Sequence, residues 1–191
     1  MLLLKLNESK KIMKQLFDQT GFACSKLVTK KYSTSFSLAV KMLAPKIRED
    51  IYSIYAFVRL ADEIVDSFHG YEKEKLLNEF EQDYYKAFAA NISLNPILNS
   101  FQLTVKKHKI TDDLIQAFLT SMKLDLNKND YETKAEYDNY IYGSADVVGL
   151  MCLKVFVNGD VERYEHLKSY AMRLGSAFQK VNFLRDLKDD Y

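Results

Sequence analysis

The chain has 191 residues, 48% of them hydrophobic, with only six glycines and two prolines. This length and composition are typical of one folded domain with a sizeable core and argue against disordered or low-complexity sequence. The 27 Lys and Arg residues are balanced by 26 Asp and Glu residues, so no basic field favours nucleic acid. We therefore predict a single domain over residues 1–191 that does not bind nucleic acid.

Apolar residues recur at helical spacing along almost the whole chain. The first three helices are predicted from Glu8 to Val28, from Ser33 as N-cap to Leu43, and from Pro45 to about Phe68. Further helices are predicted at 72–90, 96–107, 112–127, 133–157 and 160–190. No segment alternates convincingly at the period of a strand. The predicted fold class is therefore all-α.

In the third predicted helix, Tyr55, Arg59, Asp62 and Asp66 are spaced four, three and four residues apart. This spacing places them in a stripe roughly 60° wide, beside the apolar positions and not opposite them. Two carboxylates one turn apart suit a hard divalent cation, which takes oxygen ligands. The alternative is an exposed face with surface ion pairs, and the spacing alone leaves both readings open.

The last predicted helix repeats this pattern with Gln179, Asn182, Asp186 and Asp190, spaced three, four and four residues apart. Arg185 lies beside this second stripe. A solvated helix end is again the alternative. If the two stripes face each other across a cavity, their carboxylates and amides suit several Mg²⁺ ions that bridge to a diphosphate.

Three blocks, YSTSFSLAVKMLAP, IYAFVRLADEIVD and GSAFQKVNFLRDLKDDY, follow one another along the chain. In order and spacing they resemble the signature set of the squalene/phytoene synthase family, most closely the bacterial phytoene synthases. The resemblance covers essentially the whole chain. It implies an isoprenoid-synthase-type helical bundle around a central cavity.

The resemblance also implies roles for individual residues. The implied Mg²⁺ ligands, with Mn²⁺ as an alternative ion, are Asp62, Asp66, Asn182, Asp186 and Asp190. The implied substrate contacts are Tyr32, Ser33, Thr34, Ser35, Tyr55, Arg59, Tyr140, Gln179 and Arg185. The implied catalytic groups are Arg59 and the four aspartates Asp62, Asp66, Asp186 and Asp190.

The middle of the chain matches the family less specifically. The block that lines the family's substrate tunnel is resembled here by Tyr140, Ser144, Ala145, Val148 and Gly149. The small residues in this block would leave room for a polyprenyl chain on one face of the helix. Close packing between helices explains small residues equally well. Asp146 stands where many relatives have glycine, and no role is assigned to it. Leu114, Phe118, Leu119 and Met122 are predicted to be core, and a metal or catalytic role is not expected for the three histidines.

The implied activity is head-to-head condensation of two geranylgeranyl diphosphates to phytoene in carotenoid biosynthesis, without NADPH. Farnesyl diphosphate as substrate, giving squalene or dehydrosqualene, is the first alternative. A non-catalytic relative acting as a binding or assembly factor is the second, and a head-to-tail prenyltransferase or terpene cyclase is the third. The chain ends directly after the second acidic block, whereas the family continues through further helices. We therefore expect an incomplete C-terminus and doubtful activity for these residues alone.

Cys24 and Cys152 are the only cysteines, too few for a disulfide framework or a CxxC metal site. The N-terminal apolar run is too short for a signal peptide, and no stretch is expected to approach the length of a membrane span. The expected location is the cytoplasm, with peripheral contact at the inner membrane through a lipid substrate or product left open. The oligomeric state is not predicted.

Overall fold

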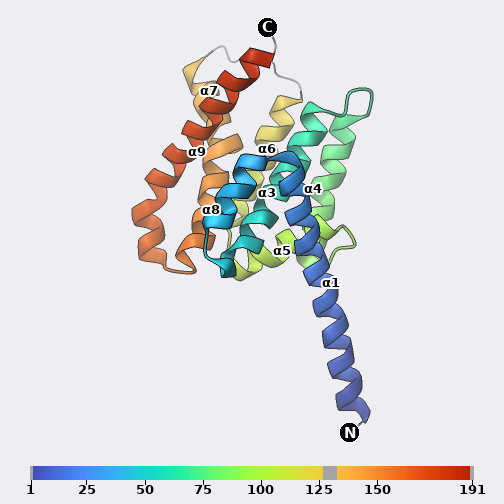
Figure 1. Cartoon of the computed structure of the whole chain (residues 1–191). Coiled ribbons are helices and arrows are strands. Elements are labelled where there is room, and N and C mark those ends of the chain that lie inside the picture. Colours follow the sequence, from blue (N-terminus) through green and yellow to red (C-terminus); the bar gives the residue numbers. More distant parts are fainter. Residues whose placement is uncertain (1, 127–132, 190–191) are drawn as a thin grey trace. The chain divides into compact units, whose positions relative to one another are not determined.

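A computed structural model describes residues 2–126 and 133–189 (Figure 1), and for residues 2–10, 183 and 185–189 it describes the backbone alone. Every regular element in these ranges is helical, which confirms the all-α prediction. The elements are α1 (Leu2–Tyr32), α2 (Thr34–Met42), α3 (Pro45–Asp66), α4 (Lys73–Ala90), α5 (Pro96–His108), α6 (Asp112–Asp125), α7 (Lys134–Ile141), η1 (Tyr142–Asp146), α8 (Val147–Val157) and α9 (Val161–Asp189).

The predicted helix boundaries agree with the structure to within a few residues, except at the start and end of α1. This helix continues past Val28 to Tyr32 because no glycine or proline interrupts it there. Ser33 then leaves the helical conformation, with φ −148° and ψ 108°, and becomes the N-cap of α2 as predicted. Pro45 begins α3, where its missing N–H costs no helical hydrogen bond.

The helix predicted over 133–157 is not uniform. A π-helical turn, η1 (Tyr142–Asp146), separates α7 from α8 without ending the helix. Such turns insert an extra residue into a helix and are often found at functional sites. Hydrophobic periodicity does not reveal such a turn, because the apolar residues on both sides of it remain helical.

The chain groups into two compact units, which we describe separately: unit 1 (residues 1–59 and 82–104) and unit 2 (residues 60–81 and 105–191). The core of unit 1 contains three aromatic side chains from different helices. Phe57 stacks on Phe101 with ring centroids 3.8 Å apart, and Tyr84 lies 5.6 Å from Phe57. All three are essentially inaccessible to solvent, so they fix the first part of α3 against α4 and α5.

Within unit 1, helix α1 packs on α3 and α5 through small and polar residues. The Ser25 and Ser100 hydroxyls lie 2.7 Å apart, and Thr29 donates to the carbonyl of Tyr52 at 3.4 Å. A Cβ atom at Gly21 would lie 2.9 Å from the carbonyl oxygen of Pro96. The backbone of α1 therefore approaches α5 too closely for a larger residue at this position.

Unit 2 contains α6 to α9, and Figure 1 shows α9 beside α8. Its core includes the four residues that were predicted to be plain core on α6, and this prediction is confirmed. Further buried side chains come from α6 and α8. The main apolar core residues on these two helices are Leu114, Ile115, Phe118, Leu119, Met122, Leu150 and Met151.

We expected no stretch long enough to span a membrane. Judged by length and composition alone, this expectation is wrong. Among the described residues, Lys134–Val157 is long and apolar enough, because α7, η1 and α8 follow one another without a break. However, 61% of its most apolar window is buried inside the protein. The core helix of a folded domain meets the same criterion, so this segment is weak evidence for a span.

Candidate functional site

In unit 1, the start of α2 is attached to α3 by an aromatic contact. The ring of Phe36 stacks on that of Tyr55, with centroids 4.7 Å apart and an interplanar angle of 22°. The Ser33 hydroxyl accepts a hydrogen bond from the backbone N–H of Phe36 at 3.2 Å. Together these contacts fix the position of the first turn of α2 relative to α3.

A second contact joins the end of α1 to the same face of α3. The guanidinium of Arg59 lies over the ring of Tyr32, 4.7 Å from its centroid. Arg59 is half-buried, whereas the side chains of Thr34 and Ser35 are exposed. The structure therefore brings together the predicted substrate segment at residues 32–35 and two of the predicted contacts on α3.

This arrangement suits an anion for two reasons. The first N–H groups of a helix have no acceptor within the helix, so the start of α2 offers donors and the positive end of a helix dipole. Arg59 adds a permanent charge whose planar donor groups match phosphate oxygens. Its cation–π contact with Tyr32 also restricts where the guanidinium lies.

The two aspartates of α3 belong to unit 2. Asp62 is half-buried and Asp66 is exposed, and the neighbouring Ala61 and Val65 are buried. Lys73 donates to the carbonyl of Val65 at 2.6 Å and so satisfies an acceptor in the last turn of α3. The carboxylates thus border the buried face of the helix, as the polar stripe predicted.

Also in unit 2, α7 and α9 bring together three predicted site residues. Tyr140 is 9% exposed, and its hydroxyl interacts with Gln179 and with the carboxylate of Asp125. Burial raises the pKa of Tyr140, the charge of Asp125 raises it further, and the hydrogen bonds with Ser144 and Gln179 partly oppose this shift. The amide nitrogen of Asn182 donates to Gln179 at 3.4 Å. Tyr140 is therefore held as a neutral phenol.

Part of the predicted site lies outside the described residues. This holds for the side chains of Arg185 and Asp186 and for the whole of Asp190. Among the residues that are described, no group of three His, Cys, Asp or Glu side chains could hold a metal ion. The pairing of the two acidic stripes across a cavity therefore stays a prediction.

The small residues of the middle block form close helix contacts. A Cβ at Gly175 would lie 2.6 Å from the carbonyl oxygen of Ala145, and one at Gly149 would lie 2.7 Å from that of Ala171. A Cβ at Gly143 would meet the side chain of Ser121 at 2.6 Å. At these positions small residues allow α9 and α6 to approach η1 and α8, which supports the packing interpretation.

Asp146 was given no role from the sequence, and the structure supplies a partner for it. The hydroxyl of Ser176 on α9 donates to its carboxylate at 2.7 Å, and the residue is 8% exposed. Burial raises the pKa of Asp146, while the Ser176 hydrogen bond and the charge of Lys180 oppose this shift. The sequence shows Asp146 as a lone charge within the apolar run from Ile141 to Leu153, but it does not indicate which residue is its partner.

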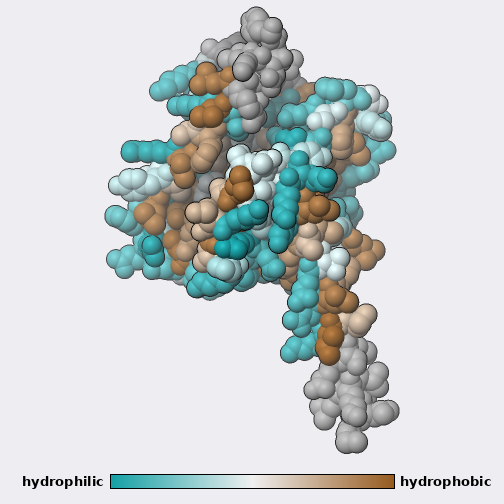
Figure 2. All heavy atoms as spheres, in the orientation of Figure 1, coloured by the Kyte–Doolittle hydropathy of each residue, from teal (hydrophilic) through white to brown (hydrophobic). Residues whose placement is uncertain are grey.

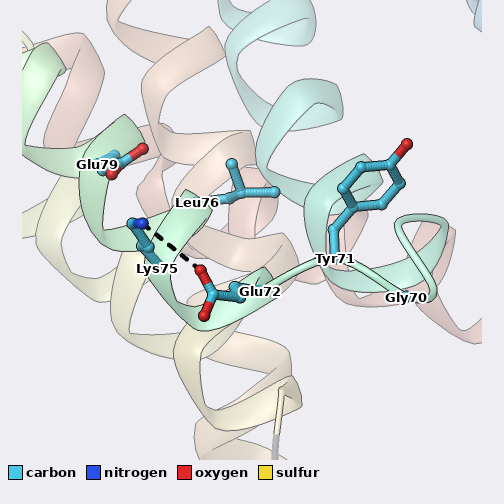
Figure 3. A pocket seen from close by; sticks show the side chains of 6 residues that line it. All are labelled: Gly70, Tyr71, Glu72, Lys75, Leu76 and Glu79. Carbon is cyan, nitrogen blue, oxygen red and sulfur yellow. Dashed lines mark ion pairs between the residues drawn. The ribbon is translucent and has the colours of Figure 1, made fainter.

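A surface hollow of about 310 Å³ lies where the chain passes from α3 to α4 (Figure 3). Glu72 and Lys75 form an ion pair of 3.5 Å across part of its rim. Its lining residues are Gly70, Tyr71, Glu72, Lys75, Leu76 and Glu79. None of these was predicted to be a site residue.

Comparison with known families gives a match over most of the chain. The model of the family described as "Squalene/phytoene synthase" matches residues 29–191. A chloroplastic phytoene synthase from Daucus carota is 29% identical over 190 residues, which cover 94% of this chain and 44% of that protein. A 4,4'-diapophytoene synthase from Staphylococcus haemolyticus is 27% identical over 166 residues, which cover 86% and 57% of the two chains.

Solved structures show the same fold. A dehydrosqualene synthase in complex with ligand superposes with a TM-score of 0.76 at 27% identity, covering 88% of this chain and 57% of that one. The squalene synthase HpnC from Alicyclobacillus acidocaldarius gives 0.77 at 25% identity, with coverage of 91% and 64%. The helices thus follow the isoprenoid-synthase type, and the chain spans about half the length of the relatives it matches.

Proposed function

The chain belongs to the squalene/phytoene synthase family of prenyltransferases, and on that premise we propose that it condenses two geranylgeranyl diphosphates head-to-head into phytoene. The observation that carries the proposal is the attachment of α2 to α3 through Phe36 and Tyr55, together with Arg59 over Tyr32. This arrangement gathers helix N–H donors and a guanidinium in one region, which is what binding of a diphosphate requires.

In the first step, the bond between the allylic carbon and the diphosphate oxygen of one substrate breaks. The electron pair leaves with the diphosphate, and an allylic cation remains. Arg59 and the first N–H groups of α2 would stabilise the negative charge of the departing group. Because the Tyr32 ring already restricts the Arg59 guanidinium, little reorganisation is needed as this charge develops.

In the second step, the double bond of the other substrate attacks the cation and gives a cyclopropylcarbinyl diphosphate with loss of one proton. A second ionisation, rearrangement and proton loss then give phytoene. These steps involve no change in overall oxidation state, so no nicotinamide is required. Tyr140 would contribute a hydroxyl and no negative charge, because its raised pKa keeps the phenol protonated.

The described residues include oxygen donors of the kind that a hard divalent cation takes. Asp62 and Asp66 place two carboxylates one turn apart on α3. Asn182 turns its amide nitrogen to Gln179, which leaves its carbonyl oxygen as the donor for a cation. We propose that Asp186 and Asp190 complete this set for Mg²⁺, with Mn²⁺ as an alternative. When bound, the ion would neutralise the diphosphate and improve it as a leaving group.

A second candidate is the same chemistry with farnesyl diphosphate, giving dehydrosqualene or squalene. One observation favours it: the chain resembles a 4,4'-diapophytoene synthase at 27% identity, close to the 29% found for a phytoene synthase. The two candidates differ in the length of the prenyl chain that the site must accept. We propose that either reaction would take place in the cytoplasm, on an amphiphilic substrate.

The deciding experiment is to incubate the chain with Mg²⁺ and either radiolabelled geranylgeranyl or farnesyl diphosphate, and to identify the hydrocarbon formed. A parallel version is extended by the C-terminal part of a bacterial phytoene synthase. Phytoene from the first substrate supports the proposal, and dehydrosqualene or squalene from the second supports the other candidate. Binding of both diphosphates without any coupled product from either version would contradict both and favour a non-catalytic role.

A further inference from the structure

Helix α1 is amphipathic in the opposite sense to a normal surface helix. Its inward face consists of Gly21, Ser25 and Thr29, which are buried against α3 and α5. Phe17, Phe22 and Val28 flank this face and are half-buried. At about 100° per residue, the buried positions lie opposite Ile12, Leu16 and Leu27. A surface helix of a folded domain usually buries its apolar face and exposes its polar one. The outward face of α1 therefore requires a separate explanation.

The outward face carries four large apolar side chains. Ile12 is 63% exposed, Met13 65%, Leu16 55% and Leu27 57%. We call this set the outer apolar face. Figure 1 shows the N-terminal half of α1 running beyond α5. In the part of this half that Figure 2 colours, from residue 11 onwards, apolar and hydrophilic side chains lie on opposite flanks of the helix. Scattered apolar residues on a surface need no explanation. Ile12, Met13 and Leu16, however, adjoin one another within about one helical turn, and Leu27 lies about three turns further along the same side. Such an apolar strip indicates a contact surface.

Charge on the same helix indicates the kind of partner. Helix α1 contains seven lysines and only two acidic residues, Glu8 and Asp18, whereas the whole chain has a net charge of +1. The rest of the chain is therefore net acidic. Lys26, Lys30 and Lys31 are exposed around Leu27, and none of them forms an ion pair with a residue that the structure describes. Positive charge is thus concentrated on the helix that carries the outer apolar face, and three of its lysines surround Leu27.

We propose that the outer apolar face of α1 docks on a bilayer that carries anionic headgroups. A bilayer offers apolar chains directly beneath phosphate groups, which matches leucine, isoleucine and methionine flanked by lysines. A second copy of this chain is a poorer occupant, because pairing two such helices would bring like charges together. The inference does not depend on the proposed reaction, since it uses none of the residues assigned to that site.

The first test measures binding of the 191-residue chain to vesicles by flotation. One vesicle set contains phosphatidylcholine alone, and the other contains equal parts of phosphatidylcholine and phosphatidylglycerol. We expect at least ~10-fold tighter partitioning to the anionic vesicles at low ionic strength, and a decline of this preference as salt is added. Equal partitioning to both sets, or no binding to either, would overturn the proposal.

The second test removes the apolar surface without introducing charge or a helix breaker. The test variant carries Ile12→Gln, Met13→Gln and Leu16→Gln. A matched control replaces three other exposed apolar residues of unit 1, through Leu38→Gln, Met42→Gln and Leu94→Gln. We expect the test variant to lose at least ~10-fold in vesicle binding and the control to bind as the unmodified chain does. Equal losses in both would show that this face has no special role.

The third test removes positive charge. Lys26→Gln, Lys30→Gln and Lys31→Gln should weaken binding to anionic vesicles about 10-fold or more. The control variant makes the same change in net charge at exposed lysines away from α1, through Lys75→Gln, Lys86→Gln and Lys168→Gln. Sedimentation of every variant separates membrane binding from self-association. The proposal would be contradicted if the unmodified chain did not bind vesicles but formed a dimer, and if the variant with Ile12, Met13 and Leu16 replaced were a monomer. That result would identify a second copy of the chain as the occupant of this face.

Discussion

The Arg59 guanidinium lies 4.7 Å from the centroid of the Tyr32 ring. The last residue of α1 is thereby in contact with a residue of α3 that follows it by 27 positions in the sequence. Ser33, the next residue, caps α2. The end of one helix, the start of another and a cation on a third are thereby placed together. This relationship leads to the first prediction.

Replacing Tyr32 with leucine should weaken binding of a prenyl diphosphate, whereas Tyr32→Phe should not. Leucine removes the aromatic face that restricts Arg59, and phenylalanine keeps it. The expected rise in the dissociation constant is about 3- to 10-fold, given the usual strength of a partly exposed cation–π contact. Titration with a thio analogue that cannot ionise measures this directly. If both variants bind alike, the ring does not position Arg59.

Asp62→Ala should reduce the rate of the condensation at least ~100-fold in any version that forms product, as loss of an electrostatic group at a reacting centre typically does. Folding should survive, because removing one of two neighbouring carboxylates relieves repulsion in the absence of metal. The matched control is Asp83→Ala on α4, where the carboxylate pairs with Lys86 on the surface. A product yield from Asp62→Ala equal to that of the control would remove Asp62 from the mechanism.

Gly175→Ala should destabilise unit 2 by about 1–3 kcal/mol, the usual cost of overpacking a tight contact. The added methyl would lie 2.6 Å from the carbonyl oxygen of Ala145, so α9 must move away from η1. Ser169→Ala is the control, because Ser169 is exposed on the same helix. Urea unfolding monitored by circular dichroism gives both values. An unchanged midpoint for Gly175→Ala would show that α9 does not approach η1 this closely.

Asp146→Asn should change how stability depends on pH. Burial raises the pKa of the carboxyl in the folded protein, so the folded state holds this proton more tightly than the unfolded chain. The contribution of Asp146 to the free energy of unfolding is therefore full below its unfolded pKa of about 3.9 and is lost as pH rises through the folded pKa. Asparagine keeps an acceptor for Ser176 but does not titrate.

We expect the asparagine variant to be more stable than the unmodified chain at pH 7, and the difference to shrink as the pH falls towards 4. Urea unfolding at a series of pH values provides the comparison. Asp146→Ala serves as the second variant, because it also removes the acceptor and should be less stable than Asp146→Asn at every pH. Lower stability of Asp146→Asn at pH 7 would mean that the hydrogen bond from Ser176 outweighs the cost of burying the charge.

Helix boundaries were predictable because local chemistry sets them. Ser33 and Pro45 start their helices for reasons that do not depend on tertiary contacts. The polar stripe of α3 was predictable from spacing alone, and its position beside buried residues is confirmed by Ala61 and Val65. The assignment of these residues to metal or substrate rests on the family resemblance and stays a proposal.

Features that depend on contacts between distant segments were not predictable from the sequence. The pairing of Asp146 with Ser176 joins positions 30 residues apart, and no local pattern specifies it. The same holds for Asp125 beside Tyr140. The inverted orientation of α1 was missed because periodicity locates an apolar face but does not say whether that face meets the core.

The π-helical turn at Tyr142–Asp146 makes this part of the chain sensitive to residue number as well as residue type. With one extra residue in the turn, Gly143 meets α6 and Gly149 meets α9 from what is otherwise a continuous helical path. Deleting a single residue here would rotate everything that follows by about 100° and carry Gly149 away from Ala171. Insertions and deletions should consequently be tolerated far less in this turn than in the connection between α3 and α4.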